Sequence, residues 1–538
     1  MLRLQQVNIA ISEEKNEQER ERQQQAQLKK KILKMLGLKQ EKELKSLEVV
    51  KRSLDARKKP QLYYSYTVDV EAAGEEKILE RCRNKNISKA ETRSYRFPTE
   101  RKERSCPPII VGMGPAGLFC AYFLARYGYR PILIERGKPV EERKKDVELF
   151  WSTGQLDPES NVQFGEGGAG TFSDGKLNTL VKEKYGRNRE VLRILVENGA
   201  PDHILYDSKP HIGTDILCLV VKNMRNQILR WGGEIRFQTK MTELLLEQGK
   251  RVKGIRLSTG DTIETDAVVL AVGHSARDTF QMCFEKQIPM DAKSFAVGFR
   301  VEHPQSLIDQ SQYGRACMRC LPAAAYKLTA KSDGGRGVYS FCMCPGGYVV
   351  NASSEPGRLA INGMSYSGRN GRNANSAILI SVTPEDYPGQ GPLAGVEFQR
   401  QIEEKAYQLG QGRIPVQYYW DFKGRKEHQG HVPGDFQPAS KGEYVFTRVN
   451  EILPQELNEA FCQGMEQFHR VIPGFADDYV CVSGVESRTS SPLRIWRDEG
   501  GQSKMRGLYP CGEGAGYAGG ITSAAMDGIY IAEMIAKG

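Results

Sequence analysis

The sequence has no long apolar run and few cysteines for its 538 residues. No stretch reaches the roughly eighteen consecutive apolar residues that a membrane-spanning helix needs. The amino terminus soon becomes charged and lacks the apolar segment and small-residue cleavage site of a secretory signal, so a cytoplasmic location is expected. The 12 cysteines are too sparse and irregular for a disulfide framework, and most are expected to be reduced thiols.

Excess charge is also missing from most of the chain. The formal net charge is +10, but residues 1–104 alone contain 26 Lys and Arg residues against 17 Asp and Glu residues. The remainder is therefore close to neutral. An acidic partner, whether RNA or an electron-carrier protein, would meet this amino-terminal region, although such a basic stretch is also typical of a solvated surface.

Residues 1–95 are predicted to form a small basic βαββα domain. Near-alternation of apolar residues, with one slip that a bulge can absorb, predicts the first strand, and helical spacing before Gly37 predicts the first helix. The polar stretch 84–105 predicts a linker, of which residues 96–104 are assigned to neither neighbouring domain. The apolar positions are Leu2, Leu4, Val7, Ile9 and Ile11; Leu28, Ile32, Met35 and Leu36; Leu47 to Leu54; Leu62, Tyr64, Tyr66, Val68 and Val70; and Ile78 and Leu79.

A complete βαβ pattern follows Cys106. An apolar strand leads into Gly112-Met113-Gly114-Pro115-Ala116-Gly117, and a helical segment then leads to a second strand ending at Glu135. Gly112 permits the tight turn, Gly114 lets the backbone approach a pyrophosphate, and Gly117 lets the helix pack on the strand. The helix amino terminus attracts phosphate, and Glu135 is placed to accept hydrogen bonds from a ribose. The predicted dinucleotide contacts are Gly112, Gly114, Pro115, Ala116, Gly117, Glu135, Arg136 and Arg143.

The region after this unit favours FAD over a nicotinamide nucleotide. Nicotinamide-binding folds usually continue with parallel βα units. Here a long insertion precedes a helical segment at 216–231, three strand-like runs at 241–265 and a buried strand at 267–273. This layout resembles the glutathione-reductase-like FAD superfamily.

That resemblance implies a role for the end of the chain. The late strand before Gly512 would meet the flavin side chain, with Glu513 in place of the usual Asp, and the helix 522–535 would point its amino terminus at the flavin ring. The contacts that the resemblance implies are Gly273, Gly512, Glu513, Gly520 and Ile521.

A second match to the glycine pattern, from Gly165 to Gly170, has no apolar strand before it and no helix after it. It is predicted to be a glycine-rich loop against the FAD, similar to that of the fumarate-reductase-like flavoenzymes; a plain structural loop is the alternative. The predicted contacts in this loop are Gly167, Gly168 and Thr171. Because there is no second complete fingerprint, a reductase with separate FAD and NAD(P)H domains is not expected.

Four motifs narrow the resemblance. These motifs make the chain resemble a bacterial family of FAD-dependent dehydrogenases whose substrate is unassigned. The resemblance extends from about residue 1 to the end of the chain. The resemblance implies FAD and a flavoenzyme fold, but not a particular reaction. The motifs are NVQFGEGGAGTFSDGKL at 161–177, CMCPGG at 342–347, NGMSY at 362–366 and ESRTSSP at 486–492.

Two cysteine pairs leave three interpretations open. The pairs are Cys317-x-x-Cys320 and Cys342-x-Cys344. All four cysteines are ordinary thiols in the first interpretation. In the second, Cys342 and Cys344 form a redox or substrate-contacting site, and in the third all four hold a metal. The one-residue spacing is poor for zinc and no His adjoins it, so no metal is predicted.

Three further residues are candidates for catalysis. His274 follows the buried strand and is either a proton donor near the cofactor or a turn cap. Arg488 is either a bidentate partner of a substrate carboxylate or a structural residue. Lys176 is a candidate electrostatic partner of reduced flavin.

The predicted fold class is α/β, with a discontinuous Rossmann-like, glutathione-reductase-like FAD-binding domain, an α+β substrate domain and the small amino-terminal domain. The FAD domain is assigned to residues 105–140, 210–280 and 484–538, and the substrate domain to residues 141–209 and 281–483.

The predicted function is an FAD-dependent dehydrogenase that exchanges a hydride between the flavin and an unidentified small molecule lodged between these domains. The electron partner is NAD(P)H bound transiently, a quinone or another protein. Two alternatives are a flavin monooxygenase that uses NAD(P)H, and an RNA- or protein-docking factor in which FAD is structural.

Overall fold

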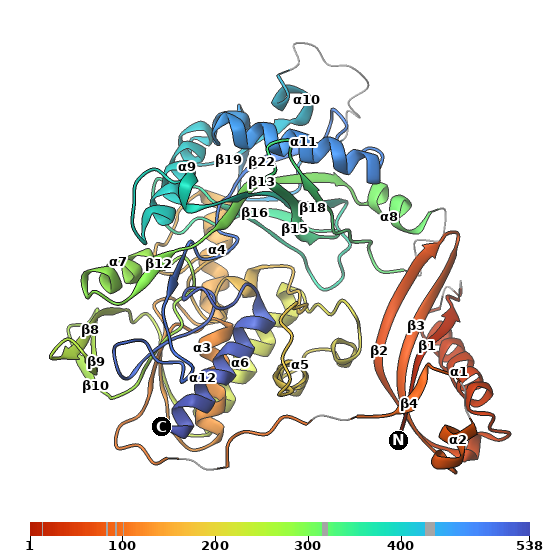
Figure 1. The fold of residues 1–538 in the computed structure, drawn as a ribbon. Coiled ribbons are helices and arrows are strands. Elements are labelled where there is room, and N and C mark those ends of the chain that lie inside the picture. Colours follow the sequence, from red (N-terminus) through yellow and green to blue (C-terminus); the bar gives the residue numbers. More distant parts are fainter. Residues whose placement is uncertain are drawn as a thin grey trace.

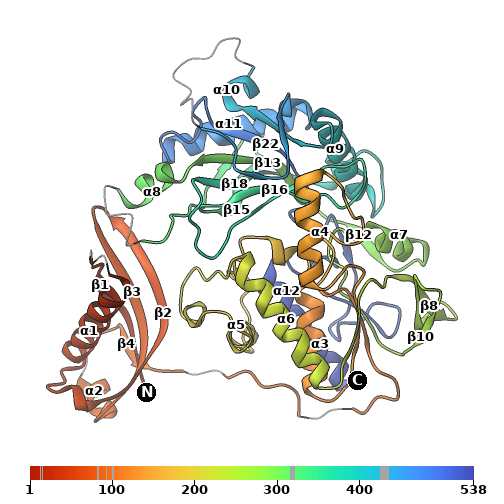
Figure 2. The same ribbon diagram turned by 180° about the vertical axis from the view of Figure 1, so that it is seen from behind.

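The computed structural model describes residues 1–12, 14, 16–81, 84–91, 94–99, 102–314, 321–424 and 436–538. Figure 1 shows three parts: a small sheet with helices at the amino terminus, a parallel sheet with helices that holds the carboxyl terminus, and a larger antiparallel sheet under helices. Figure 2 shows from behind how α4 (Val140–Thr153) runs from the second part towards the third. Among these residues, no helix is long and apolar enough to cross a membrane.

The amino-terminal unit has the predicted order of elements. The slip in the first strand is a bulge between Leu4 and Val7, and the first helix ends at Gly37, whose φ is 68°. A short extra strand around Ile87 lies within the stretch predicted as linker, because three residues are too few to show a period. The elements are β1 (Leu2–Ala10), α1 (Glu17–Leu36), a 3-10 helix (Glu41–Glu43), β2 (Leu44–Lys58), β3 (Gln61–Ala72), α2 (Glu75–Arg81) and β4 (Ile87–Lys89), in the sheet order β2-β3-β1-β4.

The predicted linker is partly core. Phe97 is buried, and its ring stacks on that of Tyr127 with the centroids 4.1 Å apart. The Tyr95 hydroxyl donates to Glu533 Oε1 at 2.9 Å. These two aromatic residues anchor the chain in the second part of the molecule, so the prediction of a free linker at 96–104 is corrected here.

The second part is built on a parallel sheet in the order β24-β11-β5-β6-β7. Alternate residues face opposite sides: Ile110 and Leu133 pack with the helices, whereas Ile109 and Ile134 pack with the small antiparallel sheet β10-β9-β8. Both faces are thus covered, as is usual for parallel strands. The strands are β5 (Ile109–Val111), β6 (Ile132–Ile134), β7 (Glu234–Arg236), β8 (Met241–Glu247), β9 (Arg251–Leu257), β10 (Thr262–Glu264), β11 (Val268–Leu270) and β24 (Leu508–Pro510).

Helices from distant parts of the sequence share the helical core of this part. Val191, Ile194 and Leu195 of α5 pack there, although residues 141–209 were predicted to belong to the substrate domain. That boundary is corrected, because the apolar face of α5 has its partners on α3, α6 and α12. The helices are α3 (Pro115–Arg126), α5 (Arg187–Glu197), α6 (Thr214–Arg230), α7 (Arg277–Glu285) and α12 (Ile521–Lys537), with 3-10 helices at Ala169–Phe172 and Asp202–Leu205.

The third part is an antiparallel sheet in the order β14-β15-β18-β13-β22-β19-β21, and its apolar core is covered by α8, α9, α10 and α11. The predicted boundary at residue 484 falls inside β22, which belongs to this sheet. The elements are β13 (Phe295–Pro304), α8 (Gln305–Tyr313), β14 (Thr329–Lys331), β15 (Gly337–Cys344), β18 (Asn373–Val382), α9 (Ala394–Gly410), β19 (Ile414–Tyr418), α10 (Tyr419–Phe422), β21 (Tyr444–Phe446), α11 (Gln455–Val471) and β22 (Cys481–Glu486).

Two smaller sheets complete the structure, in the orders β17-β16-β20 and β12-β23. In the second, Met290 pairs with Ile495, and both residues pack in the core between the parallel sheet and the sheet β10-β9-β8. Their strands are β12 (Met290–Ala292), β16 (Tyr348–Asn351), β17 (Ile361–Met364), β20 (Ser440–Lys441) and β23 (Leu493–Ile495), and further 3-10 helices lie at Pro384–Asp386 and Val449–Glu451.

Candidate cofactor site

A cavity of about 320 Å³ lies where the carboxyl ends of the parallel strands face the antiparallel part. Its lining includes Glu135 and Lys240, the fingerprint loop, and Lys176 and Cys342. Of the predicted site residues, those that line it are Gly112, Gly114, Pro115, Ala116, Glu135, Arg136, Gly168, Gly273, Glu513, Gly520, Ile521, His274, Cys342, Arg488 and Lys176.

The fingerprint loop has the space that a pyrophosphate needs. A Cβ at Gly112 would lie 2.4 Å from the Ala271 oxygen, and one at Gly117 would lie 1.9 Å from the Gly112 oxygen, so both positions require glycine for packing. A Cβ at Gly114 would meet only the Gly168 Cα, at 3.9 Å. Gly114 caps α3 without a side-chain hydrogen bond, so the helix amino terminus stays open to an anion.

Glu135 binds two loops together. Its Oε2 accepts a hydrogen bond from Met113 N at 2.8 Å, and its Oε1 accepts from Gly137 N and Gly165 N, both at 2.9 Å. The carboxylate therefore couples the fingerprint turn to the glycine-rich loop as well as lining the cavity. Its contact with a ribose stays a prediction.

Arg143 is not placed as a cofactor contact, which corrects the prediction. Its side chain is fully buried outside the cavity lining and donates to the carbonyl oxygens of Asn161 at 2.8 Å, Val162 at 2.9 Å and Glu166 at 2.6 Å. A Cβ at Gly165 would lie 2.3 Å from Arg143 Cδ. Arg143 thus supports the glycine-rich loop from behind.

Some other predicted contacts also lie behind the lining. Thr171 is buried, and its Oγ1 would be 2.0 Å from a Cβ at Gly167. Gly512 N donates to Asp527 Oδ2 at 2.7 Å. Gly117, Gly167, Thr171 and Gly512 therefore shape the loops without lining the cavity.

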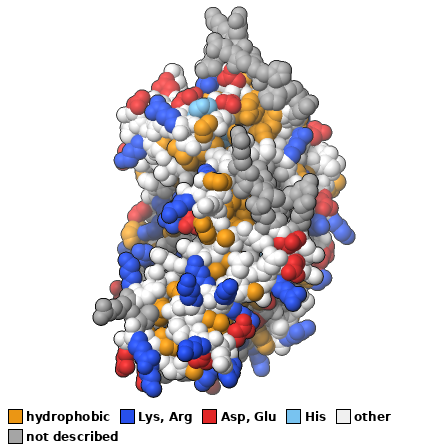
Figure 3. Space-filling view, turned by 90° about the vertical axis from the view of Figure 1, so that its right-hand side faces the viewer, with side chains coloured by type: hydrophobic (Ala, Val, Ile, Leu, Met, Phe, Trp, Pro, Cys, Tyr) orange, Lys and Arg blue, Asp and Glu red, His pale blue; other side chains and the backbone are white. Residues whose placement is uncertain are grey.

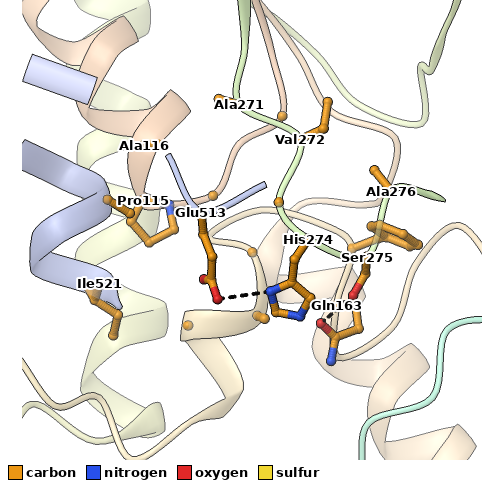
Figure 4. Close-up of a pocket in the computed structure, with 18 of the residues that line it drawn as sticks. Pro115, Ala116, Gln163, Ala271, Val272, His274, Ser275, Ala276, Glu513 and Ile521 are labelled. Carbon is orange, nitrogen blue, oxygen red and sulfur yellow. Dashed lines mark hydrogen bonds and ion pairs between the residues drawn. The ribbon is translucent and has the colours of Figure 1, made fainter. Parts of the chain in front are cut away.

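Two polar groups converge near the start of α12. His274 Nδ1 lies 3.1 Å from Glu513 Oε1, and the two side chains point toward each other in Figure 4. The other ring nitrogen, Nε2, is buried and has no hydrogen-bond partner among the residues that the structure describes. Gly520 caps α12 without a side-chain hydrogen bond, so this helix also presents open N–H groups to the cavity.

Arg488 lines the cavity, but its donors are engaged. It binds Glu403 through two hydrogen bonds, of 2.9 Å and 2.8 Å, and its Nη1 also donates to Ser275 and Ser354. Arg277 binds the same carboxylate from the other side. Burial alone would raise the pKa of Glu403, but Arg277 and Arg488 outweigh burial and hold it well below its usual range.

Cys342 and Lys176 both line the cavity. Lys176 Nζ is 3.1 Å from Asp174 Oδ2 and also donates to the Met343 oxygen. Burial lowers the pKa of Lys176, but the Asp174 carboxylate and the nearby thiols outweigh that effect and raise it. Cys344 is buried behind Cys342 and does not line the cavity.

The hypothesis of a four-cysteine site cannot be built on the described residues, because Cys317 and Cys320 lie outside them. Within those ranges, no group of three or more His, Cys, Asp or Glu side chains is arranged to hold a metal ion. Sequence reasoning missed Asn362 and Glu486 as lining residues, although both stand in motifs of the family resemblance.

A glycine turn at the end of a parallel strand, followed by an uncapped helix, defines a dinucleotide-binding fold. A family model described as "FAD-dependent protein, C-terminal domain-like" matches residues 294–489, and a model for a domain of unknown function matches residues 1–71. An uncharacterized protein of Clostridium beijerinckii is 46% identical over 540 residues, covering 99% of this chain and 98% of its own. The chain belongs to the same family as that protein, and FAD is its cofactor.

Solved structures with a distant likeness include a fumarate reductase and a proline dehydrogenase. A variant of the E. coli quinol fumarate reductase subunit FrdA has a TM-score of 0.36 and 12% identity, covering 80% of this chain and 69% of its own. L-proline dehydrogenase from P. horikoshii has a TM-score of 0.33 and 13% identity, covering 81% of this chain and 94% of its own. Scores this low say nothing about the reaction of this chain.

Proposed function

We propose that this protein is an FAD-dependent oxidoreductase that exchanges a hydride between FAD and a small-molecule substrate at the Lys176 end of the cavity. The observation that carries the proposal is the continuity of one cavity past two uncapped helix amino termini, those of α3 and α12, to polar groups of the antiparallel part. FAD, when bound, supplies a redox centre that takes up or gives two electrons.

The residues of this chain have separate tasks in the proposal. Gly114 and the amino terminus of α3 bind the phosphates, and Glu135 orients the loops at the adenosine end. The amino terminus of α12 and Lys176 stabilise negative charge that develops at the opposite end. These groups are fixed before the reaction, so little reorganisation is needed.

His274 is the group best placed to hold a proton. The carboxylate of Glu513 accepts from Nδ1–H, which fixes the tautomer and leaves Nε2 as an acceptor without a protein partner. A substrate proton transferred to Nε2 would give an imidazolium that Glu513 stabilises. His274→Gln should therefore retain FAD but slow flavin reduction by the substrate.

The test starts from the purified full-length chain. It should be yellow and release FAD on denaturation. Groups of amino acids, hydroxy acids, thiols and both reduced nicotinamide nucleotides are then added without oxygen while flavin absorbance is followed. Bleaching by one group identifies the substrate class, and a colourless protein that binds NAD but not FAD would refute the proposal. Oxygen consumption with a hydroxylated product would instead support the monooxygenase hypothesis.

A further inference from the structure

A bulge in β15 turns one cysteine toward the cavity. Phe341 pairs with Ala377, and Cys344 pairs with Asn375, so β15 has one residue more than β18 between these points. Cys342 occupies the bulge with a φ of 41°, in the left-handed region that a residue with a side chain rarely adopts. As a result the Cys342 side chain lines the cavity, while Cys344 is buried next to it.

The two sulfur atoms are adjacent and differ in protonation. Cys344 Sγ lies 3.2 Å from the Cys342 oxygen and within hydrogen-bond reach of the Cys342 side chain. A hydrogen bond from the Cys344 thiol lowers the pKa of Cys342, and although burial opposes this, the positive charges of Lys176 and Arg300 add to the lowering. Burial and the neighbouring thiolate raise the pKa of Cys344. Of the two, Cys342, which lines the cavity, is therefore the thiol that ionises more readily, and Cys344 is the one that keeps its proton.

This combination sets Cys342 apart from other cysteines in the described ranges. Burial raises the pKa of each of the following thiols: Cys120, Cys218, Cys283, Cys462, Cys481 and Cys511. Reactive cysteines lie in electropositive, partly accessible surroundings, whereas structural ones are buried among apolar groups. Only the first description fits Cys342, which is partly exposed beside Lys176 and Arg300.

We propose that Cys342 and Cys344 form a redox-active dithiol that exchanges two electrons with the bound FAD, so that the substrate of the site is a dithiol or its disulfide. This inference rests on the FAD-dependent oxidoreductase function proposed above, with the cysteine pair relaying the two electrons in place of a direct hydride transfer between substrate and FAD. Two steps of a fully extended chain span at most about 7 Å between Cα atoms, and disulfides join Cα atoms about 4.4–6.8 Å apart. The bulged backbone at Cys342 is less than fully extended, which brings the pair into that range.

The half-reaction balances with the bound FAD as the electron acceptor. In the oxidative direction a bond forms between the Cys342 thiolate and the Cys344 thiol; two electrons and the Cys344 proton pass to the cofactor. A substrate thiolate then attacks the Cys342 sulfur, and Cys344 leaves and takes up a proton. The second substrate thiolate displaces Cys342, which releases a substrate disulfide and restores the pair, with the remaining proton going to solvent.

The test is an anaerobic titration of oxidised, FAD-loaded protein with dithionite. The full-length wild type should take up about four electrons per FAD, because flavin and disulfide are each two-electron couples. Cys342→Ser and Cys344→Ser should take up about two, whereas Cys462→Ser, a matched change on α11, should behave as wild type. Equal uptake of about two electrons by wild type and Cys344→Ser overturns the inference.

Thiol labelling provides a second measurement that needs no variant. Mass spectrometry of the oxidised wild type should find a peptide with Cys342 and Cys344 joined and resistant to alkylation, which dithiothreitol makes reactive. Two free, alkylated thiols in the oxidised protein would overturn the inference. A protein that binds FAD and takes up only two electrons contradicts the dithiol alone, whereas a protein without FAD contradicts the proposed function itself.

Discussion

Arg488 and Glu403 form a two-point ion pair inside the protein, with Arg488 Nε 2.9 Å from Glu403 Oε1 and Nη2 2.8 Å from Oε2. We expect Arg488→Ala to lower the free energy of unfolding by about 3–5 kcal/mol, because it leaves a buried carboxylate short of one partner. Thermal unfolding of the FAD-loaded protein measures this, with the exposed Arg470→Ala as control. If Arg488→Ala has unchanged stability but binds a carboxylate substrate more weakly, the result would support a substrate-binding role for Arg488.

Gly114→Val should abolish FAD binding while leaving the fold intact. Only the Gly168 Cα lies near the added Cβ, at 3.9 Å, so the protein itself has room for the side chain, whereas the phosphate does not. FAD content and thermal unfolding are measured together. Wild-type protein should gain about 2.7 kcal/mol at a hundredfold excess of FAD over its Kd, and the variant should gain nothing.

Gly334→Val is the matched control for this change. A Cβ at Gly334 meets only Ser332 Oγ, at 3.9 Å, on a turn between β14 and β15. This variant should carry as much FAD as wild type. Stoichiometric FAD in Gly114→Val would mean that the fingerprint loop does not approach the phosphates.

Glu135→Ala should damage the site more than the loss of ribose contacts alone. Three backbone N–H groups, those of Met113, Gly137 and Gly165, lose their acceptor, and each unpaired buried donor costs about 1–3 kcal/mol. We expect weaker FAD binding together with a lower unfolding temperature of the FAD-free protein. If that temperature stays unchanged while FAD binding falls, the ribose contact accounts for the whole effect.

The sequence predicted much of the fold and many of the residues that line the cavity. Gly112 to Glu135 could be placed because one strand, one turn and one helix fix them locally, and the alternation in β1 and β3 is equally local. The contacts of Arg143 and Arg488 could not be predicted, since their partners are loop carbonyls and a carboxylate on α9, which only the tertiary fold brings near. The bulge at Cys342 likewise depends on the register with β18.

Removing the amino-terminal unit should leave FAD binding intact if the cut respects the aromatic anchors. A chain of residues 94–538 keeps Tyr95 and Phe97, whereas a chain of residues 100–538 loses the stacking of Phe97 on Tyr127. We expect full FAD content in the first truncate and a lower unfolding temperature in the second. A first truncate that folds without FAD would show that the unit completes the cofactor site.

The deletion also exposes the surface on which the unit docks. Arg52 of β2 binds Asp207 with hydrogen bonds of 2.7 Å and 3.0 Å, and its backbone N–H donates to the Tyr206 oxygen at 2.6 Å. Figure 3 shows the face of the molecule on which the amino-terminal unit lies. Basic and acidic side chains are interspersed over the part of this face that can be seen. The acidic partner expected for residues 1–104 stays a prediction, and salt-dependent binding of RNA to the full chain tests it.

His303 should make stability fall as the solution becomes acidic. Its Nε2–H donates to the Phe475 oxygen at 2.8 Å, and burial lowers its pKa from 6.5 to about 4. Between pH 6.5 and pH 4 the imidazole is therefore protonated in the unfolded chain but neutral in the folded chain. The free energy of unfolding has its full value above pH 6.5 and declines as the pH falls from 6.5 to 4. Between pH 7 and pH 5 the loss is about 2 kcal/mol.

His303→Gln keeps a donor for the Phe475 oxygen and removes the titration. Its unfolding temperature should fall less than that of wild type between pH 7 and pH 5. The neighbouring Glu302, whose pKa burial raises to about 7, acts in the opposite direction but is present in both proteins, so its effect cancels in the comparison. Parallel declines in the two proteins would contradict the assignment to His303.

The anchoring of Tyr95 also limits how far the amino-terminal unit can move from the FAD-binding part. Ala90 is held to the amino-terminal unit by its N–H, which donates to the Met1 oxygen at 3.0 Å, so five residue steps connect that unit to the anchor. A fully extended chain of that length covers roughly 18 Å. If the contact between Arg52 and Asp207 opened, an acidic partner bound to the amino-terminal unit would still stay close to the FAD-binding part. Its effective concentration there would exceed that of a competitor free in solution.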